Sequence, residues 1–289
     1  MLVLSQDVVA ALLDPDALID ALADAMRDLS AGRASVPPRV AALVQERSGL
    51  LGAMPAYLPS ASILESKLVS LFPHNAGTPV PTHQAVIVVF DPDTGSPTAL
   101  MDATHITEAR TAAGSALATR LLARDGAKVL AVLGTGVQAR AHARTVSRVR
   151  PFEEIRVAGR DPAKAASMVA DLDRELPMTV TAAALFKEAM AGADVVCACT
   201  HSPDPVVRRD AVEPGMHINS VGYNTEGREV DAETVRDAIV VVESRDTVLA
   251  PPPAGANDIA WPIRDGVVGP EHIHAEVGEL VAGARPGRT

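Results

Sequence analysis

Aromatic residues are scarce in this 289-residue chain: four Phe, two Tyr and one Trp make up 2% of it. Hydrophobic residues nevertheless account for 47%, so the sequence predicts a core built from Ala, Val, Leu and Ile. Disorder is excluded, because a chain this apolar can bury enough surface to fold. The length suffices for one large domain or two ordinary ones.

Cysteine and positive charge are also in short supply. Cys197 and Cys199 lie two residues apart in an apolar run without a nearby histidine cluster, which predicts two small buried side chains and no metal site. Lys and Arg number 26 against 36 Asp and Glu, a formal charge of −10. This balance argues against a nucleic acid as partner, because binding a phosphate backbone needs a basic surface.

Long apolar runs and targeting patterns are absent as well. No apolar run reaches the roughly 18 residues of a membrane span. The N-terminal sequence MLVLSQDVVAALLDPD lacks the basic segment and cleavage pattern of a secretory signal. We therefore expect no membrane association and a cytoplasmic location.

The first part of the chain has the pattern of a mixed α+β domain. Residues 15–31 carry apolar side chains at helical spacing and end at Gly32. Short apolar runs separated by turn residues follow at 50–54, 66–72, 84–91 and 98–101. Consecutive strands with short turns predict a partly antiparallel sheet. An Ala-rich helix over 107–124 closes this part.

The second part alternates between strands and helices. Apolar runs occur at 128–133, 155–158, 178–182, 194–199, 217–222 and 238–243, with helical segments between them. This alternation predicts a parallel sheet covered by helices. The fold class is therefore α/β, with a Rossmann dinucleotide-binding domain at 121–289 and a smaller α+β domain for substrate and dimerisation at 1–120.

The sharpest motif is GTGVQA, which follows the strand KVLAVL and opens a helix. The first glycine permits the tight turn, and the second lets the backbone approach a pyrophosphate, which the helix N-terminus then stabilises. Ala139 replaces the third glycine of the fingerprint, a change that the motif tolerates. We expect the dinucleotide to contact Gly134, Thr135, Gly136, Val137 and Gln138.

The end of the second strand distinguishes the two nicotinamide cofactors. NAD sites place Asp or Glu there for the ribose 2′-OH, whereas this strand runs into Gly159 and Arg160. A guanidinium suits a 2′-phosphate, and Asp161 precedes Pro162 as a helix cap would. The sequence favours NADP(H), with NAD(H) as the alternative if Arg160 is an ordinary surface arginine.

The ordered segments PPR, MPA, K…FPHN, TGSPTALMD, ITEARTAAGSALA, GTGVQA and GMHINSVG resemble the ornithine cyclodeaminase/mu-crystallin family over the whole chain. The resemblance implies a two-domain protein, typically a homodimer. Members include ornithine and lysine cyclodeaminases, alanine dehydrogenases, and reductases of cyclic ketimines and other imino acids. Their shared ligand is a small amino or imino acid beside a nicotinamide ring.

The resemblance also implies site residues. Arg39, Lys67 and Arg110 occupy the positions that the family uses for the substrate carboxylate, and a planar guanidinium matches its two oxygens. Three other readings remain open: Arg110 in a salt bridge between domains, Lys67 facing water, and Arg39 on the surface. Further candidates for cofactor contacts are Thr82, Thr111 and Val221.

One difference from the cyclodeaminases of this family bears on the reaction that we expect. The cyclodeaminases carry an aspartate where this sequence has Asn224, and an amide cannot act as a base. We therefore expect reduction of a small imino acid or cyclic ketimine carboxylate, or the reverse oxidation, with Lys67 and Asn224 as catalytic candidates. Two arginine neighbours would lower the pKa of Lys67, which could then share the imine proton.

Two alternatives keep the same fold: a cyclodeaminase that recycles bound NAD, and a non-catalytic NADPH-binding protein of the crystallin kind. Family members continue beyond a segment like GELVAGARPGRT into a piece of chain that returns to the substrate domain. The sequence ends at Thr289, so the predicted domain division lacks that piece.

Overall fold

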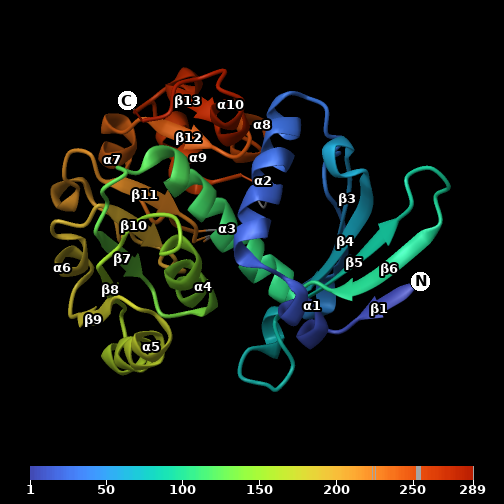
Figure 1. Ribbon diagram of the computed structural model, residues 1–289, viewed down its shortest axis with the longest axis horizontal. Coiled ribbons are helices and arrows are strands. Elements are labelled where there is room, and N and C mark those ends of the chain that lie inside the picture. The colour runs from blue at the N-terminus through green and yellow to red at the C-terminus, as the bar shows by residue number, and fades with distance from the viewer. Residues whose placement is uncertain (223, 225, 252–254, 289) are drawn as a thin grey trace. The chain divides into compact units, whose positions relative to one another are not determined.

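The computed structural model describes residues 1–222, 224, 226–251 and 255–288. The chain divides into two compact units, Met1–Arg110 and Thr111–Thr289 (Figure 1). This division falls inside helix α3 (Thr104–Leu122), ten residues before the boundary predicted at residue 120. The difference arises because α3 is one continuous helix whose first turns belong to unit 1 and whose remainder belongs to unit 2.

Unit 1 is built on a six-stranded sheet in the order β1-β6-β5-β4-β3-β2. Strands β3 to β6 pair antiparallel as predicted, β2 pairs antiparallel with β3, and β1 joins β6 in parallel. The predicted helix and four strands are present, and β1 and β2 were not predicted. The elements are β1 Leu2–Leu4, α1 Gln6–Leu12, α2 Pro15–Ser30, β2 Val40–Val44, η1 Gln45–Arg47, β3 Gly49–Leu58, η2 Pro59–Ala61, β4 Ile63–Leu71, η3 Pro73–Asn75, β5 His83–Phe90 and β6 Pro97–Asp102.

Local sequence explains where helix α2 begins and ends. The carboxylate of Asp14 accepts a hydrogen bond from the Ala17 amide (2.8 Å), and Pro15 occupies the first helical position, where its missing N–H costs nothing. Gly32 follows the helix with a φ of +66°, a conformation that glycine adopts without strain.

The two faces of the unit 1 sheet differ. The inner face carries Val69 and Ala85, which pack with Ala103 at the start of α3. The Ala103 amide donates to the Ala85 carbonyl (2.9 Å), so the first turn of α3 is anchored to this face. The outer face carries the alternate residues of each strand.

Unit 2 contains a five-stranded sheet in the order β11-β10-β7-β8-β9, with every neighbouring pair parallel. This is the strand order of a Rossmann domain, and its switch point lies between β7 and β10. The elements are β7 Val129–Leu133, α4 Val137–Val146, β8 Glu154–Ala158, α5 Pro162–Glu175, β9 Thr179–Ala183, α6 Phe186–Met190, β10 Val195–Ala198, η4 Arg209–Ala211, β11 His217–Ser220, α7 Ala232–Asp237, β12 Val240–Val242, α8 Arg245–Val248, α9 Asn257–Arg264, η5 Pro270–His272, β13 Ile273–Glu276 and α10 Val277–Val281.

The prediction that the run 238–243 continues the main sheet is wrong. It forms β12, which pairs with β13 in a separate two-stranded parallel sheet. Both sheets contribute to one aliphatic core, in which Val196, Val240 and Ile273 are buried together. An apolar run predicts burial in a strand, but it carries no information about which strand becomes its partner. None of the described helices is long and apolar enough to span a membrane.

Candidate active site

The candidate dinucleotide site of unit 2 begins at the turn after β7. Gly134 has a φ of +123°, and a Cβ there would lie 2.4 Å from the Cys199 carbonyl oxygen that follows β10. The Gly134 amide donates to the Ala158 carbonyl at the end of β8 (2.8 Å). The turn therefore needs glycine, and it lies at the switch point of the sheet, where α/β proteins bind their ligands.

The next residues leave room for a bound anion. Gly136 caps α4, and a Cβ there would meet no atom within 4 Å. Val137, in the first helical turn, is 60% exposed, and the buried Gln138 Oε1 has no hydrogen-bond partner. The open approach to the helix N-terminus fits a pyrophosphate, whereas the unpaired acceptor fits a hydroxyl donor such as those of the adjoining ribose.

The end of β8 lies beside this turn. A Cβ on Gly159 would come within 2.6 Å of Thr135 Cγ2, which places the following Arg160 next to the fingerprint. Arg160 is exposed. The Asp161 carboxylate caps α5 by accepting from the Ala163 amide (3.0 Å), as predicted. Since Asp161 is engaged in this cap, the cation Arg160 is the charged group that the loop presents.

Two buried carboxylates connect the loops that follow β10 and β11. Glu229 is 2% exposed and accepts hydrogen bonds from the amide and hydroxyl of Thr200 and from the amide of Gly222. Asp258 accepts from the Ser220 hydroxyl (2.6 Å) and the Val230 amide (2.9 Å). Burial raises the pKa of both carboxyls, and their donors oppose that rise. Sequence reasoning missed this network, because no motif or periodicity marks either acid.

Val221 and Asn224 line a cavity of about 210 Å³ at the end of β11. The Asn224 Nδ2 donates to the His201 carbonyl (3.0 Å), and its Oδ1 accepts from the Glu226 amide (2.8 Å). Asn257 donates to the Asn224 carbonyl (2.7 Å). The Asn224 side chain therefore braces the loop through both of its polar groups.

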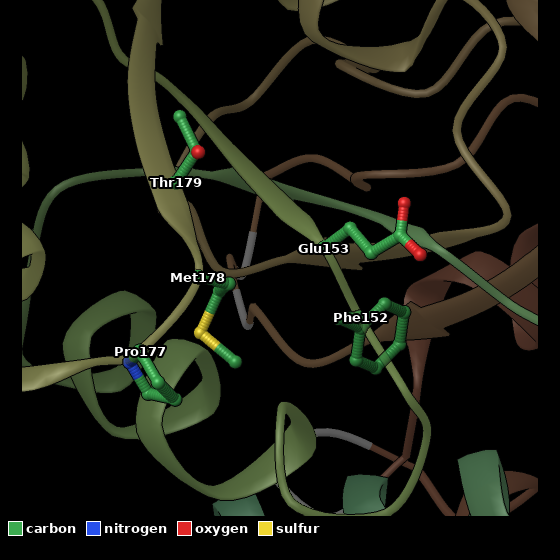
Figure 2. A pocket seen from close by; sticks show the side chains of 5 residues that line it. All are labelled: Phe152, Glu153, Pro177, Met178 and Thr179. Atoms are coloured by element: carbon green, nitrogen blue, oxygen red, sulfur yellow. The ribbon is translucent and has the colours of Figure 1, made fainter.

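Another cavity, of about 350 Å³, lies where β8 and β9 begin (Figure 2). Its lining includes Phe152, Glu153 and Met178. This is the amino-terminal edge of the sheet, opposite the fingerprint. Because parallel sheets bind ligands beyond the carboxyl ends of their strands, this cavity is not part of the candidate site.

Unit 1 carries a candidate substrate site of its own, around Lys67 in the middle of β4. Its Nζ donates to the Thr107 hydroxyl (2.7 Å), and that hydroxyl donates to the Ala103 carbonyl (2.8 Å). The Thr107 proton is thus committed to the helix, which leaves its oxygen to accept from lysine. Arg110 lies three residues on, on the same side of α3. Lys67 is half-buried and bound to α3, which favours the site interpretation over the alternative in which its side chain faces water.

Charge and burial lower the pKa of Lys67. Burial is the largest cause, the positive charges of Arg110 and Arg39 add to it, and Glu65 opposes it. Arg39 directly precedes β2, whose first residue Val40 pairs with Ala53 on β3, and the next residue of β3, Met54, pairs with Lys67. The charges of both predicted arginines thus act on Lys67, although Arg39 itself is exposed, as the alternative interpretation allowed. Thr82 also belongs to unit 1, before β5, and Thr111 follows Arg110 in α3.

Sequence reasoning missed Glu65. It precedes Lys67 by two residues, so the alternation of a strand places both side chains on the inner face. Its Oε2 is buried without a hydrogen-bond partner. Burial raises the pKa of this carboxyl, and the charge of Lys67 opposes the rise. The strand period could have identified it once Lys67 was assigned to this face.

Comparison with known proteins extends these observations. The ketimine reductase mu-crystallin of Mus musculus is 37% identical over 251 residues, which cover 86% of this chain and 75% of that protein. The Δ(1)-pyrroline-2-carboxylate reductase of Thermococcus litoralis, solved with NADH and L-proline, has a TM-score of 0.92 and 36% identity, covering 100% of this chain and 88% of the other.

A solved archaeal alanine dehydrogenase dimer with bound NAD has a TM-score of 0.91 and 31% identity, with 100% of this chain and 87% of that chain covered. The family model described as ornithine cyclodeaminase/mu-crystallin matches residues 1–289. The chain belongs to the ornithine cyclodeaminase/mu-crystallin family.

Proposed function

We propose that this protein is an NAD(P)H-dependent reductase of small imino acids or cyclic ketimine carboxylates, which also runs in reverse as an amino-acid dehydrogenase. The observation that carries the proposal is the cationic group of Arg39, Lys67 and Arg110 in a chain with an intact dinucleotide turn. The similar proteins include reductases named for C=N substrates and an alanine dehydrogenase.

The cationic group suits a carboxylate. Arg110 and Arg39 provide planar guanidinium donors, which match the two oxygens of a carboxylate. The Lys67 ammonium has three donors, and Thr107 accepts one of them. The others remain for a ligand. This arrangement holds the acid group of the substrate and leaves its C=N bond accessible.

Lys67 also suits the proton chemistry. When bound, NAD(P)H supplies the hydride that adds to the carbon of the C=N bond. Reduction needs the imine nitrogen to be protonated, and an ammonium with a lowered pKa shares its proton more readily than an ordinary lysine. Thr107 fixes the position of that ammonium.

Two other functions are less well supported. A cyclodeaminase needs a base, whereas both polar groups of the Asn224 side chain are engaged in holding its own loop. A protein that only binds the dinucleotide has no need for three cations arranged around a carboxylate site. We therefore retain reduction as the proposed reaction.

A substrate screen tests this function. Purified protein is mixed with NADPH or NADH and with Δ(1)-pyrroline-2-carboxylate, its six-membered homologue, or pyruvate and ammonia, and absorbance is followed at the nicotinamide band. We expect cofactor oxidation with at least one imino acid. Ammonia release from ornithine or lysine without net cofactor turnover would instead identify a cyclodeaminase. Tight cofactor binding with no turnover in either assay would indicate a binding protein.

We also propose that NADP(H) is preferred over NAD(H). Arg160 is exposed beside Thr135, and the adjacent Asp161 is occupied as a helix cap. Replacing Arg160 with Ala should weaken NADPH binding by about 10- to 100-fold, the value of charge-assisted hydrogen bonds to a phosphate. NADH binding should change little.

Fluorescence titration with both cofactors measures this difference. Arg208→Ala, which removes another well-exposed arginine of unit 2, is the matched control and should leave both affinities unchanged. An equal loss of NADPH and NADH affinity in Arg160→Ala would refute the assignment.

For unit 1 we propose a second role as the homodimer interface. On its outer face Val40, Leu51 and Val86 are 66%, 49% and 37% exposed. They lie on β2, β3 and β5, and the register puts all three on the same face of the sheet. An exposed apolar sheet face of this kind is typical of a subunit contact. The archaeal relative solved with NAD is a dimer. Cytoplasmic location stays a prediction.

Substituting Leu51 and Val86 together by Lys should convert the dimer into monomers, because the two charges would be buried in the interface. Sedimentation velocity should then show a species of the chain mass, 30.0 kDa, instead of twice that value. The control is Ile239→Lys, at a residue of unit 2 that is 80% exposed. A double variant that stays dimeric would exclude this face as the interface.

A further inference from the structure

Glu65 is an acidic side chain beside a cationic group, and the proposed reaction gives it no task. It lies on β4 two residues before Lys67, so both side chains project from the inner face of the sheet. Its strand partners are Ala56 on β3 and Val89 on β5. Neither partner side chain has a polar atom, so the sheet itself offers Glu65 nothing to bind.

One oxygen of the Glu65 carboxylate has no hydrogen-bond partner among the described residues. This oxygen, Oε2, is buried, and no ion pair joins the carboxylate to Lys67 in the described part of the chain, where the Lys67 Nζ donates to Thr107 instead. An unpaired buried carboxylate oxygen is costly, and native proteins rarely leave one without a reason. A ligand that carries a donor would satisfy it.

The distance along the strand fits one ligand that reaches both groups. The Cα atoms of residues two apart in a strand are about 6.6 Å apart, so both side chains border the same small area of the inner face. A carboxylate held at Lys67 therefore leaves the other end of the ligand free to reach Glu65. The negative charge there attracts a hydrogen-bond donor and repels a second carboxylate.

Resting on the proposed function, we propose that Glu65 determines substrate specificity. It selects imino acids whose side chain carries a hydroxyl or amino donor, and it rejects dicarboxylic imino acids. In this role it contacts the side chain of the substrate, while Lys67 and the two arginines hold the shared acid group.

The test compares three probes in wild type and Glu65→Gln: Δ(1)-pyrroline-2-carboxylate, its 4-hydroxy derivative, and iminosuccinate formed from oxaloacetate and ammonia. In the variant, kcat/KM for the dicarboxylate should rise about tenfold and that for the hydroxylated ring should fall about tenfold, relative to the plain ring. Glu46→Gln removes an exposed acid of unit 1 and is the control for net charge. A merely structural role would change all three substrates by one factor, and that result would overturn the proposal.

Failure of the proposed function is distinguishable from failure of this inference. If wild type turns over none of the probes, calorimetry measures the same preference through the binding affinities of L-proline, trans-4-hydroxy-L-proline and L-aspartate. If the ratio of these affinities changes in Glu65→Gln, the inference is supported even though the proposed reduction is not. Binding ratios that are identical in wild type and Glu65→Gln, or no binding of any of the three, refute the inference.

Discussion

Replacing Lys67 by Met should lower kcat/KM for the best imino acid by about 10²- to 10⁴-fold, the usual contribution of a positioned proton-transfer group. The variant loses the ammonium that contacts the ligand but keeps a side chain of similar length. Its fold should survive, because a half-buried ammonium with a lowered pKa does not stabilise the native state at neutral pH. Only the hydrogen bond to Thr107 is lost, a change of about 1 kcal/mol.

The role of Lys67 also predicts how the reduction rate changes with pH. The folded-state pKa of Lys67 lies below that of the unfolded chain, so the ammonium is lost at a lower pH than usual. The wild-type reduction rate should therefore fall as pH rises through that lowered pKa, and Lys67→Met should lack this limb. Lys128→Met is the control, because it removes a lysine that pairs with Glu153 on the surface of unit 2. Full activity in Lys67→Met would remove Lys67 from the mechanism.

The second large effect is expected at Gly136. Its backbone φ is −83°, which any residue adopts, and a Cβ there would meet open space. Gly136→Val should therefore leave the unfolding temperature nearly unchanged. Because the added side chain fills the approach to the helix N-terminus, binding of NADPH and NADH should weaken by at least tenfold.

Two other glycine variants provide comparisons for Gly136→Val, one expected to be destabilised and one expected to be unchanged. Gly134→Ala should lower the free energy of unfolding by about 1–3 kcal/mol from backbone strain alone, and more from the approach to the Cys199 carbonyl. Gly126→Ala meets no atom within 4 Å and should change neither stability nor binding. Calorimetry and thermal unfolding measure both quantities for each variant. If Gly136→Val binds both cofactors like wild type, the dinucleotide does not lie on this turn.

Much of the architecture was predictable because its signals are local. Apolar runs bounded by turn residues identified β3 to β6 of unit 1 and the five strands of the main sheet of unit 2, and GTGVQA identified the turn at Gly134. The cap at Asp161 followed from the Asp-Pro pair. The strand β12 was assigned to the wrong sheet, because pairing depends on partners that lie far away in the sequence.

The candidate site was predictable only in part. Motif resemblance identified Arg39, Lys67 and Arg110, and in the structure the charges of the two arginines act on Lys67. Thr107, which positions Lys67, was overlooked because a hydroxyl inside a helix is usually satisfied by its own backbone. The carboxylates of Glu229 and Asp258 were missed because burial of an acid leaves no periodic mark.

By itself, the sequence determined that the chain is α/β, that one turn is shaped for a pyrophosphate, and that three cations were available. Those conclusions depend on composition and on spacings within a few residues, which short-range physics controls. Only the tertiary structure decided which face Lys67 occupies, that Glu65 shares it, and that its oxygen has no partner. Such features depend on burial and on register between strands, and both arise only when distant segments pack together.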